Sequence, residues 1–75
     1  MLRDGKGRRG LVESFDPRVG LGEVRTADGL RFPFHCTEIV DGSRDIGVGT
    51  AVGFVLAPGQ RGIWEARAVG AEPPA

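Results

Sequence analysis

The sequence predicts an all-β fold in which five short antiparallel strands close into a small barrel. Short apolar and β-branched runs alternate with turns rich in glycine and proline, and no segment keeps a helical period over three turns. Five strands at this spacing favour closure, because a closed barrel removes the exposed edges of a sheet. With 75 residues, the chain has the length of one small domain.

Turn residues divide the chain into its elements. Asp16-Pro17 ends the first strand, and Asp28-Gly29 is a strong hairpin signal. Pro33 has no N–H to donate, so the third strand is expected at an edge or a bulge. The strands are expected at 8–15, 20–26, 30–35, 50–57 and 63–69, with one short helical turn at 37–40.

The domain organisation follows from these elements. We expect a flexible basic arm at 1–7, the barrel at 8–70 and a disordered tail at 71–75. Gly20 and Gly22 lie within the second strand, where glycines typically mark a sharp bend and leave the backbone approachable.

Alternation assigns the inward and outward side chains. Phe32 and Phe34 share one face of the third strand and are expected in the core. Trp64 shares a face with Ala66 and Ala68, which favours its partial burial.

Composition and charge limit the class of function. Lysine plus arginine equals aspartate plus glutamate, so the formal net charge is 10 − 10 = 0. A nucleic-acid binder is usually basic, so any such binding here must come from local charge placement. One cysteine, no signal peptide and no apolar run of about 20 residues predict a cytoplasmic protein without a membrane segment. We expect it to be a monomer.

Catalytic and metal sites are not expected. No carboxylate pair, triad or metal-ligand set has suitable spacing, and His35 and Cys36 should point to opposite faces of their strand. The chain has no second cysteine or histidine to complete a metal site. We therefore expect no enzyme activity, no metal and no cofactor.

The order and spacing of these residues resemble the cold-shock domain family over positions 10–69. The first motif of that family is matched by Gly10-x-Val12-x-x-Phe15-Asp16-Pro17-x-x-Gly20-x-Gly22. The second motif is matched by Phe32-x-Phe34-His35-Cys36-Thr37-x-Ile39. The last two strands are matched by Gly49-x-x-Val52-x-Phe54 and Gly62-x-x-x-Ala66.

The resemblance implies a barrel of the OB type that binds single-stranded RNA or DNA. Members of the family stack bases on surface aromatics beside a basic groove, and their glycines let a base and its sugar approach the sheet. The resemblance further implies a role as an RNA chaperone or as a regulator of transcription or translation. The chain resembles a small cold-shock protein of the bacterial type, in divergent form.

This sequence departs from the family at most of the stacking positions. Aromatic residues of the family are replaced by Ser14, Leu21, Glu23, Pro33 and Cys36. Its lysines are replaced by Leu11, Glu13 and Val19. Since one stacked base contributes roughly 1–3 kcal/mol, we expect weaker binding than is typical of the family.

Several residues are candidates for the nucleic-acid contact. Phe15 either stacks a base or closes one end of the barrel, and His35 either stacks and hydrogen-bonds or is simply exposed at a strand end. Trp64 is either a substitute stacking surface or a core plug. The arginines either form a groove or are scattered over the surface. The candidate set is Arg8, Phe15, Arg18, Leu21, Glu23, His35, Arg61 and Trp64.

An alternative function is a protein-interaction module that has lost nucleic-acid binding. In this interpretation an exposed apolar patch replaces the stacking platform. The patch would consist of Leu11, Val19, Leu21, Pro33 and Val55.

Overall fold

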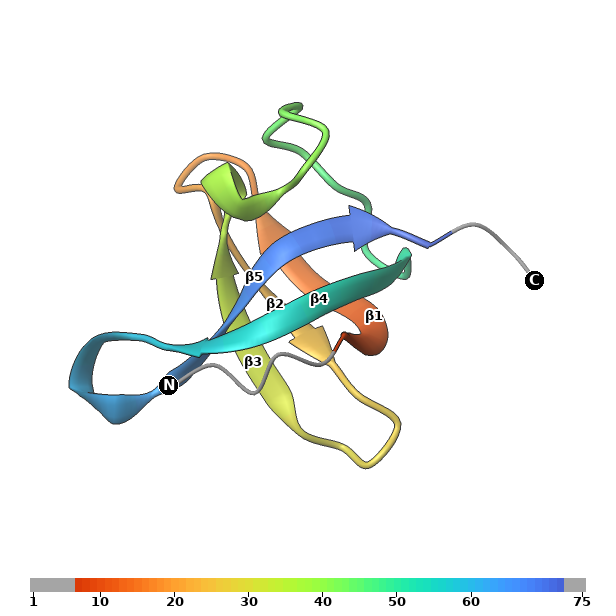
Figure 1. Ribbon diagram of the computed structural model, residues 1–75. Coiled ribbons are helices and arrows are strands. Elements are labelled where there is room, and N and C mark those ends of the chain that lie inside the picture. The colour runs from red at the N-terminus through yellow and green to blue at the C-terminus, as the bar shows by residue number, and fades with distance from the viewer. Residues whose placement is uncertain (1–6, 73–75) are drawn as a thin grey trace.

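The computed structural model describes residues 7–72 and has five antiparallel strands that curl into a barrel (Figure 1). The expectation of an all-β barrel of OB type is confirmed. The strands are β1 (Arg8–Asp16), β2 (Leu21–Arg25), β3 (Arg31–His35), β4 (Ala51–Pro58) and β5 (Trp64–Ala71). Two short 3₁₀ turns are η1 (Cys36–Glu38) after β3 and η2 (Gln60–Gly62) between β4 and β5.

The sheet extends slightly beyond the expected barrel boundary at residue 70. β5 includes Ala71, and the Glu72 N–H donates to the Ala51 carbonyl at 2.8 Å. The first two residues of the expected tail at 71–75 are therefore part of the sheet or bonded to it. Most of the expected arm (1–6) and the end of the tail (73–75) lie outside the described residues.

The barrel closes where the two ends of the sheet meet. The strand order is β3-β2-β1-β4-β5, so β3 is at one end of the sheet, as Pro33 predicts. β3 lies against β5, and Ile39 forms a parallel bridge with Val69. The Val40 N–H donates to the Val69 carbonyl at 2.9 Å. The chain leaving η1 thus ties the β3 end of the sheet to β5.

The core is a cluster of small and medium apolar side chains around two phenylalanines. Phe34 is buried, as alternation predicts, whereas Phe32 is half-buried and packs against the edge of the core beside Phe54. The buried residues are Val12, Val24, Phe34, Ile39, Val52, Phe54, Leu56, Ala66 and Val69.

Gly20 and Gly22 serve the inside of the barrel rather than a ligand, which corrects the expectation that they leave the backbone approachable. Both are buried. A Cβ on Gly22 would lie 2.7 Å from the Phe34 ring and 2.6 Å from the Ser14 carbonyl oxygen. A Cβ on Gly20, whose φ is +76°, would lie 2.7 Å from Cys36 Sγ. Gly22 therefore lets Phe34 pack directly against β2. Gly20 lies in the turn before β2 rather than within the strand as expected, and there it lets Cys36 approach the backbone.

A bulge in β5 changes which of its side chains face the core. The register between β4 and β5 shifts between Gly53 and Val55, and Ala68 in this region has a φ of +54°. Ala66 is buried but Ala68 is exposed, so the expectation that they share a face with Trp64 is wrong. The Ala68 N–H donates to Glu38 Oε1 at 3.1 Å, which links the bulge to η1.

We predict that Gly22→Ala destabilises the fold. The added methyl group meets a backbone oxygen and a buried ring, so overpacking should cost about 1–3 kcal/mol of unfolding free energy. For a domain of this size that is a fall in Tm of roughly 4–20 °C, measurable by thermal denaturation. Gly47→Ala is the matched control, because its added Cβ makes only an ordinary contact with Thr50. Equal Tm values for the Gly22→Ala and Gly47→Ala variants would contradict the close packing assigned to Gly22.

Candidate nucleic-acid interface

The outer face of β1, β2 and β3 consists of three rows of side chains that run across the strands. The pairing of the strands fixes which residues are neighbours. The rows are Asp16–Leu21–His35, Ser14–Glu23–Pro33 and Leu11–Arg25–Arg31. Two inward rows alternate with them, Phe15–Gly22–Phe34 and Val12–Val24–Phe32.

The first row brings two of the predicted site residues together, and a third lies in the next row. Leu21 and His35 are exposed neighbours, and Phe15 is half-buried in the next row. The Phe15 ring stacks on Phe34 with a centroid distance of 5.9 Å and an interplanar angle of 9°. Phe15 therefore helps to close this end of the barrel, and its contact with a base stays a prediction.

The surroundings of His35 leave its ring available at the surface. His35 Nδ1 lies 3.3 Å from the Thr37 hydroxyl oxygen, so its other ring nitrogen can serve an external partner. Cys36 is half-buried and packs against the core, but its Sγ lies 4.0 Å from His35 Nδ1. The expectation that the two side chains point to opposite faces of one strand is therefore wrong, because β3 ends at His35 and Cys36 begins η1. Within residues 7–72, no group of three or more His, Cys, Asp or Glu side chains is placed to hold a metal ion.

Glu13 holds two arginines in the middle of the outer face. Glu13 Oε1 lies 3.4 Å from Arg25 Nε, and Glu13 Oε2 accepts a hydrogen bond from Arg31 Nε. This bond and the charge of Glu13 raise the pKa of Arg31, and the charge of Glu23 adds to the effect. The register shift in β1 between Val12 and Ser14 falls at Glu13. No feature of the sequence indicates this register shift, so the contact of Glu13 with the two arginines could not be predicted.

The remaining predicted site residues are spread over the barrel. Arg18 lies in the turn after β1, where its N–H donates to Asp16 Oδ1 at 2.9 Å, and Glu23 lies in the second row. Arg61 lies in η2 between β4 and β5, and Trp64 is the first residue of β5, where it pairs with Pro58. Trp64 keeps 43% of its surface exposed, so it is partly covered but is not a core plug.

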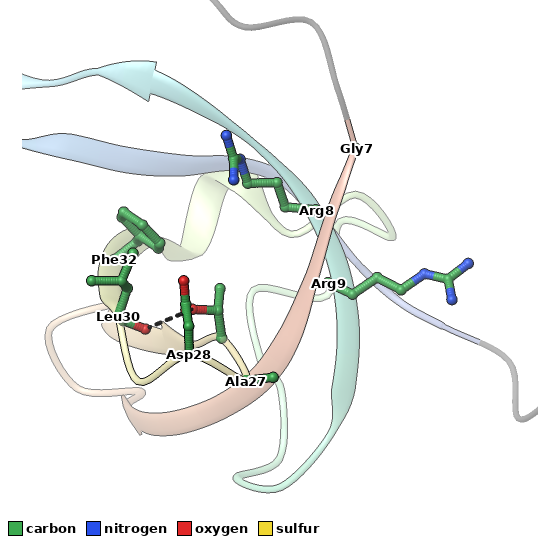
Figure 2. Close-up of a pocket in the computed structure, with 8 residues that line it drawn as sticks. Gly7, Arg8, Arg9, Ala27, Asp28, Leu30 and Phe32 are labelled. Atoms are coloured by element: carbon green, nitrogen blue, oxygen red, sulfur yellow. Dashed lines mark hydrogen bonds between the residues drawn. The ribbon is translucent and has the colours of Figure 1, made fainter.

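Arg8, the first residue of β1, lies near the start of β3, whereas His35 is at the other end of that strand. It borders a hollow of about 390 Å³ together with Asp28, Leu30 and Phe32. Figure 2 shows Arg8 extending over this hollow, whereas Arg9 points away from it. The Asp28 carboxylate accepts a hydrogen bond from the Thr26 hydroxyl, which lowers the pKa of Asp28, and nearby Arg8 lowers it slightly further. The structure therefore separates Arg8 from the row that contains His35.

The apolar residues of the alternative interaction patch do not form a continuous surface. Leu11 and Leu21 are exposed but lie in the third and first rows, with the Glu23 row between them. Val55 is on β4, where it pairs with Arg67. Charged side chains thus divide the patch that the sequence suggested.

A second hollow that sequence reasoning missed lies between the end of β3 and β5. Its lining consists of His35, Pro58, Gly59, Glu65 and Arg67. Glu65 and Arg67 form an ion pair, with Arg67 Nη2 3.1 Å from Glu65 Oε1. Because Glu65 and Arg67 are two residues apart on one strand, the sequence indicates that they share a face. That His35 lies close to them depends on how the barrel closes, which the sequence does not show.

These features define a small antiparallel barrel of the OB type, with an architecture like that of cold-shock domains. Among solved structures, the chain is similar to one described as drosophila Unr CSD456, with 29% sequence identity and a TM-score of 0.76. That match covers 95% of this chain, which spans only 29% of the other chain. No model of a protein family matches the sequence, and neither does any curated protein. Within residues 7–72, no helix has the length and apolar character needed to cross a membrane.

We predict that Asp28 contributes to stability in a pH-dependent way. Its pKa is lowered in the folded state from 3.8, so the contribution is complete above that value and is lost as the pH falls through the lowered pKa. Asp28→Asn should therefore be less stable than the parent at neutral pH, and the difference should shrink below about pH 4. Urea denaturation across this range measures it. Thr26→Val should give the same trend, and a difference independent of pH would contradict the assignment.

Proposed function

We propose that the protein binds single-stranded RNA or DNA on the outer face of β1, β2 and β3. The observation that carries the proposal is the row of exposed Leu21 and His35 beside the half-buried Phe15 ring. The cold-shock architecture supports it, since sheets of this kind offer bases a flat surface on which to stack. In this proposal the domain is a binding module rather than an enzyme.

The proposed binding is weaker than is usual for such domains. Two aromatic surfaces remain near the row, and Glu13 and Glu23 place negative charge where phosphates would pass. Arg18, in the turn after β1, and Arg61, in η2, are the proposed phosphate contacts. A monomeric, cytoplasmic RNA chaperone or regulator of transcription or translation is the role that fits this activity.

The proposal is tested by fluorescence anisotropy with labelled heptauridylate and heptathymidylate at low and at physiological salt. If about three phosphates are neutralised, the logarithm of the affinity should fall with the logarithm of salt with a slope near −2. His35→Ala should weaken binding roughly 5- to 150-fold, the range of one stacked base. Leu30→Ala, exposed on the β2–β3 hairpin, is the matched control. No binding to either oligonucleotide at low salt would overturn the proposal and favour a protein partner.

We further predict that Glu13→Gln strengthens binding. The substitution removes the negative charge that holds Arg25 and Arg31, so both guanidinium groups become available to phosphates. Affinity at low salt should rise several-fold, and the salt slope should steepen by roughly 0.7 for each phosphate gained.

Asp45→Asn is the control for this prediction. It makes the same change in net charge on the loop between η1 and β4, away from the outer face of β1–β3. An equal gain in affinity from both variants would show that overall charge, rather than release of the two arginines, is responsible.

A further inference from the structure

The hollow between β3 and β5 continues the first row of the proposed interface. It has a volume of about 480 Å³ and is shared by the end of β3, the start of the β4–β5 turn and the first half of β5. His35 belongs both to this hollow and to the Asp16–Leu21–His35 row. A single-stranded nucleic acid that crosses the outer face of β1–β3 along this row therefore reaches the hollow.

The polar groups of the hollow suit a base rather than a phosphate. Glu65 and Arg67 neutralise each other, and their side chains remain 33% and 40% exposed, so both can still reach a ligand. A carboxylate repels phosphate but accepts hydrogen bonds from ring and exocyclic N–H groups. Within the described residues, Glu65 Oε2 has no hydrogen-bond donor, so it is available to accept one.

The Glu65 carboxylate lies against Gly59. A Cβ on Gly59 would collide with the carboxylate carbon and Oε2 of Glu65. The carboxylate is therefore in direct contact with the backbone of the turn. This turn is itself held by the Gly59 N–H, which donates to the Ile63 carbonyl. In this structure the acceptor thus lies at the edge of the hollow, beside a glycine that leaves room for it.

We propose that this hollow is a base-recognition subsite that prefers guanine. The Watson–Crick edge of guanine presents an acceptor, O6, followed by two donors, N1–H and the N2 amino group. Arg67 can donate to O6 while the Glu65 carboxylate accepts from N1–H and N2. Adenine, cytosine and uracil do not present two adjacent donors on that edge. His35 and Pro58 provide flat surfaces for the base.

This inference rests on the proposed function, and its test separates the two. Binding of UUUUUUU is compared with UUUGUUU, with UUUAUUU, and with the same heptamer carrying inosine, which lacks only the N2 amino group. The parent protein should prefer the guanine heptamer over UUUUUUU about tenfold, which lies within the range of one bidentate base contact. Inosine should lose part of that preference, and adenine all of it.

Glu65→Gln should abolish the preference for guanine and leave the affinity for UUUUUUU unchanged or slightly raised. Gly59→Ala, which keeps the charge but displaces the carboxylate, should also reduce it. Glu72→Gln is the control, because it makes the same charge change at a carboxylate paired with Arg9. Amide spectra establish that each variant is folded.

The outcomes are distinct. If UUUUUUU binds but guanine gives no gain, or if Glu65→Gln keeps the gain, the guanine subsite is overturned and the proposed function stands. If no heptamer binds, both are overturned.

Discussion

The packing of the Phe34 ring against the backbone of β2 is the contact on which the rest of the barrel depends. Phe34 is buried against Gly22, which has no side chain to keep the ring away, and the Phe15 ring stacks on it. This contact draws the three strands β1, β2 and β3 tightly around the core. It also sets the alternation that turns Leu21, Glu23 and His35 outward, so the core and the proposed interface have the same origin.

The charges on the outer face limit which parts of a nucleic acid the proposed interface can contact. The chain has no net charge, so it lacks the general attraction that draws a basic protein to nucleic acid. Arg25 and Arg31 form ion pairs with Glu13, and Arg67 forms an ion pair with Glu65. In the proposed function, contacts with the edges and faces of bases therefore outweigh contacts with phosphates. The proposal assigns these paired carboxylates and guanidinium groups to discrimination between bases rather than to high affinity.

The sequence was a good guide to the strands and a poorer guide to the site. Turn residues such as Asp16-Pro17 and Asp28-Gly29 are local, so five strands and Phe34 in the core could be predicted. The two bulges depend on how the strands pair. For this reason, neither the contact of Glu13 with the two arginines nor the exposure of Ala68 could be predicted from the sequence. The hollow beside His35 exists only because β3 meets β5 on closure, which alternation within one strand does not reveal. Gly22 was placed correctly in the second strand, whereas Gly20 lies in the turn before it. Both were given the wrong partner, since a family motif does not show which face of the sheet a glycine contacts.

The most direct test of the account is an amide ¹H–¹⁵N correlation spectrum recorded during titration with heptauridylate, first at low salt and then at physiological salt. We expect shifts at residues 20–23 and 33–36. These shifts should weaken with added salt. Shifts confined to residues 7–9, or their absence throughout the chain, would contradict a binding surface on the outer face of β1–β3.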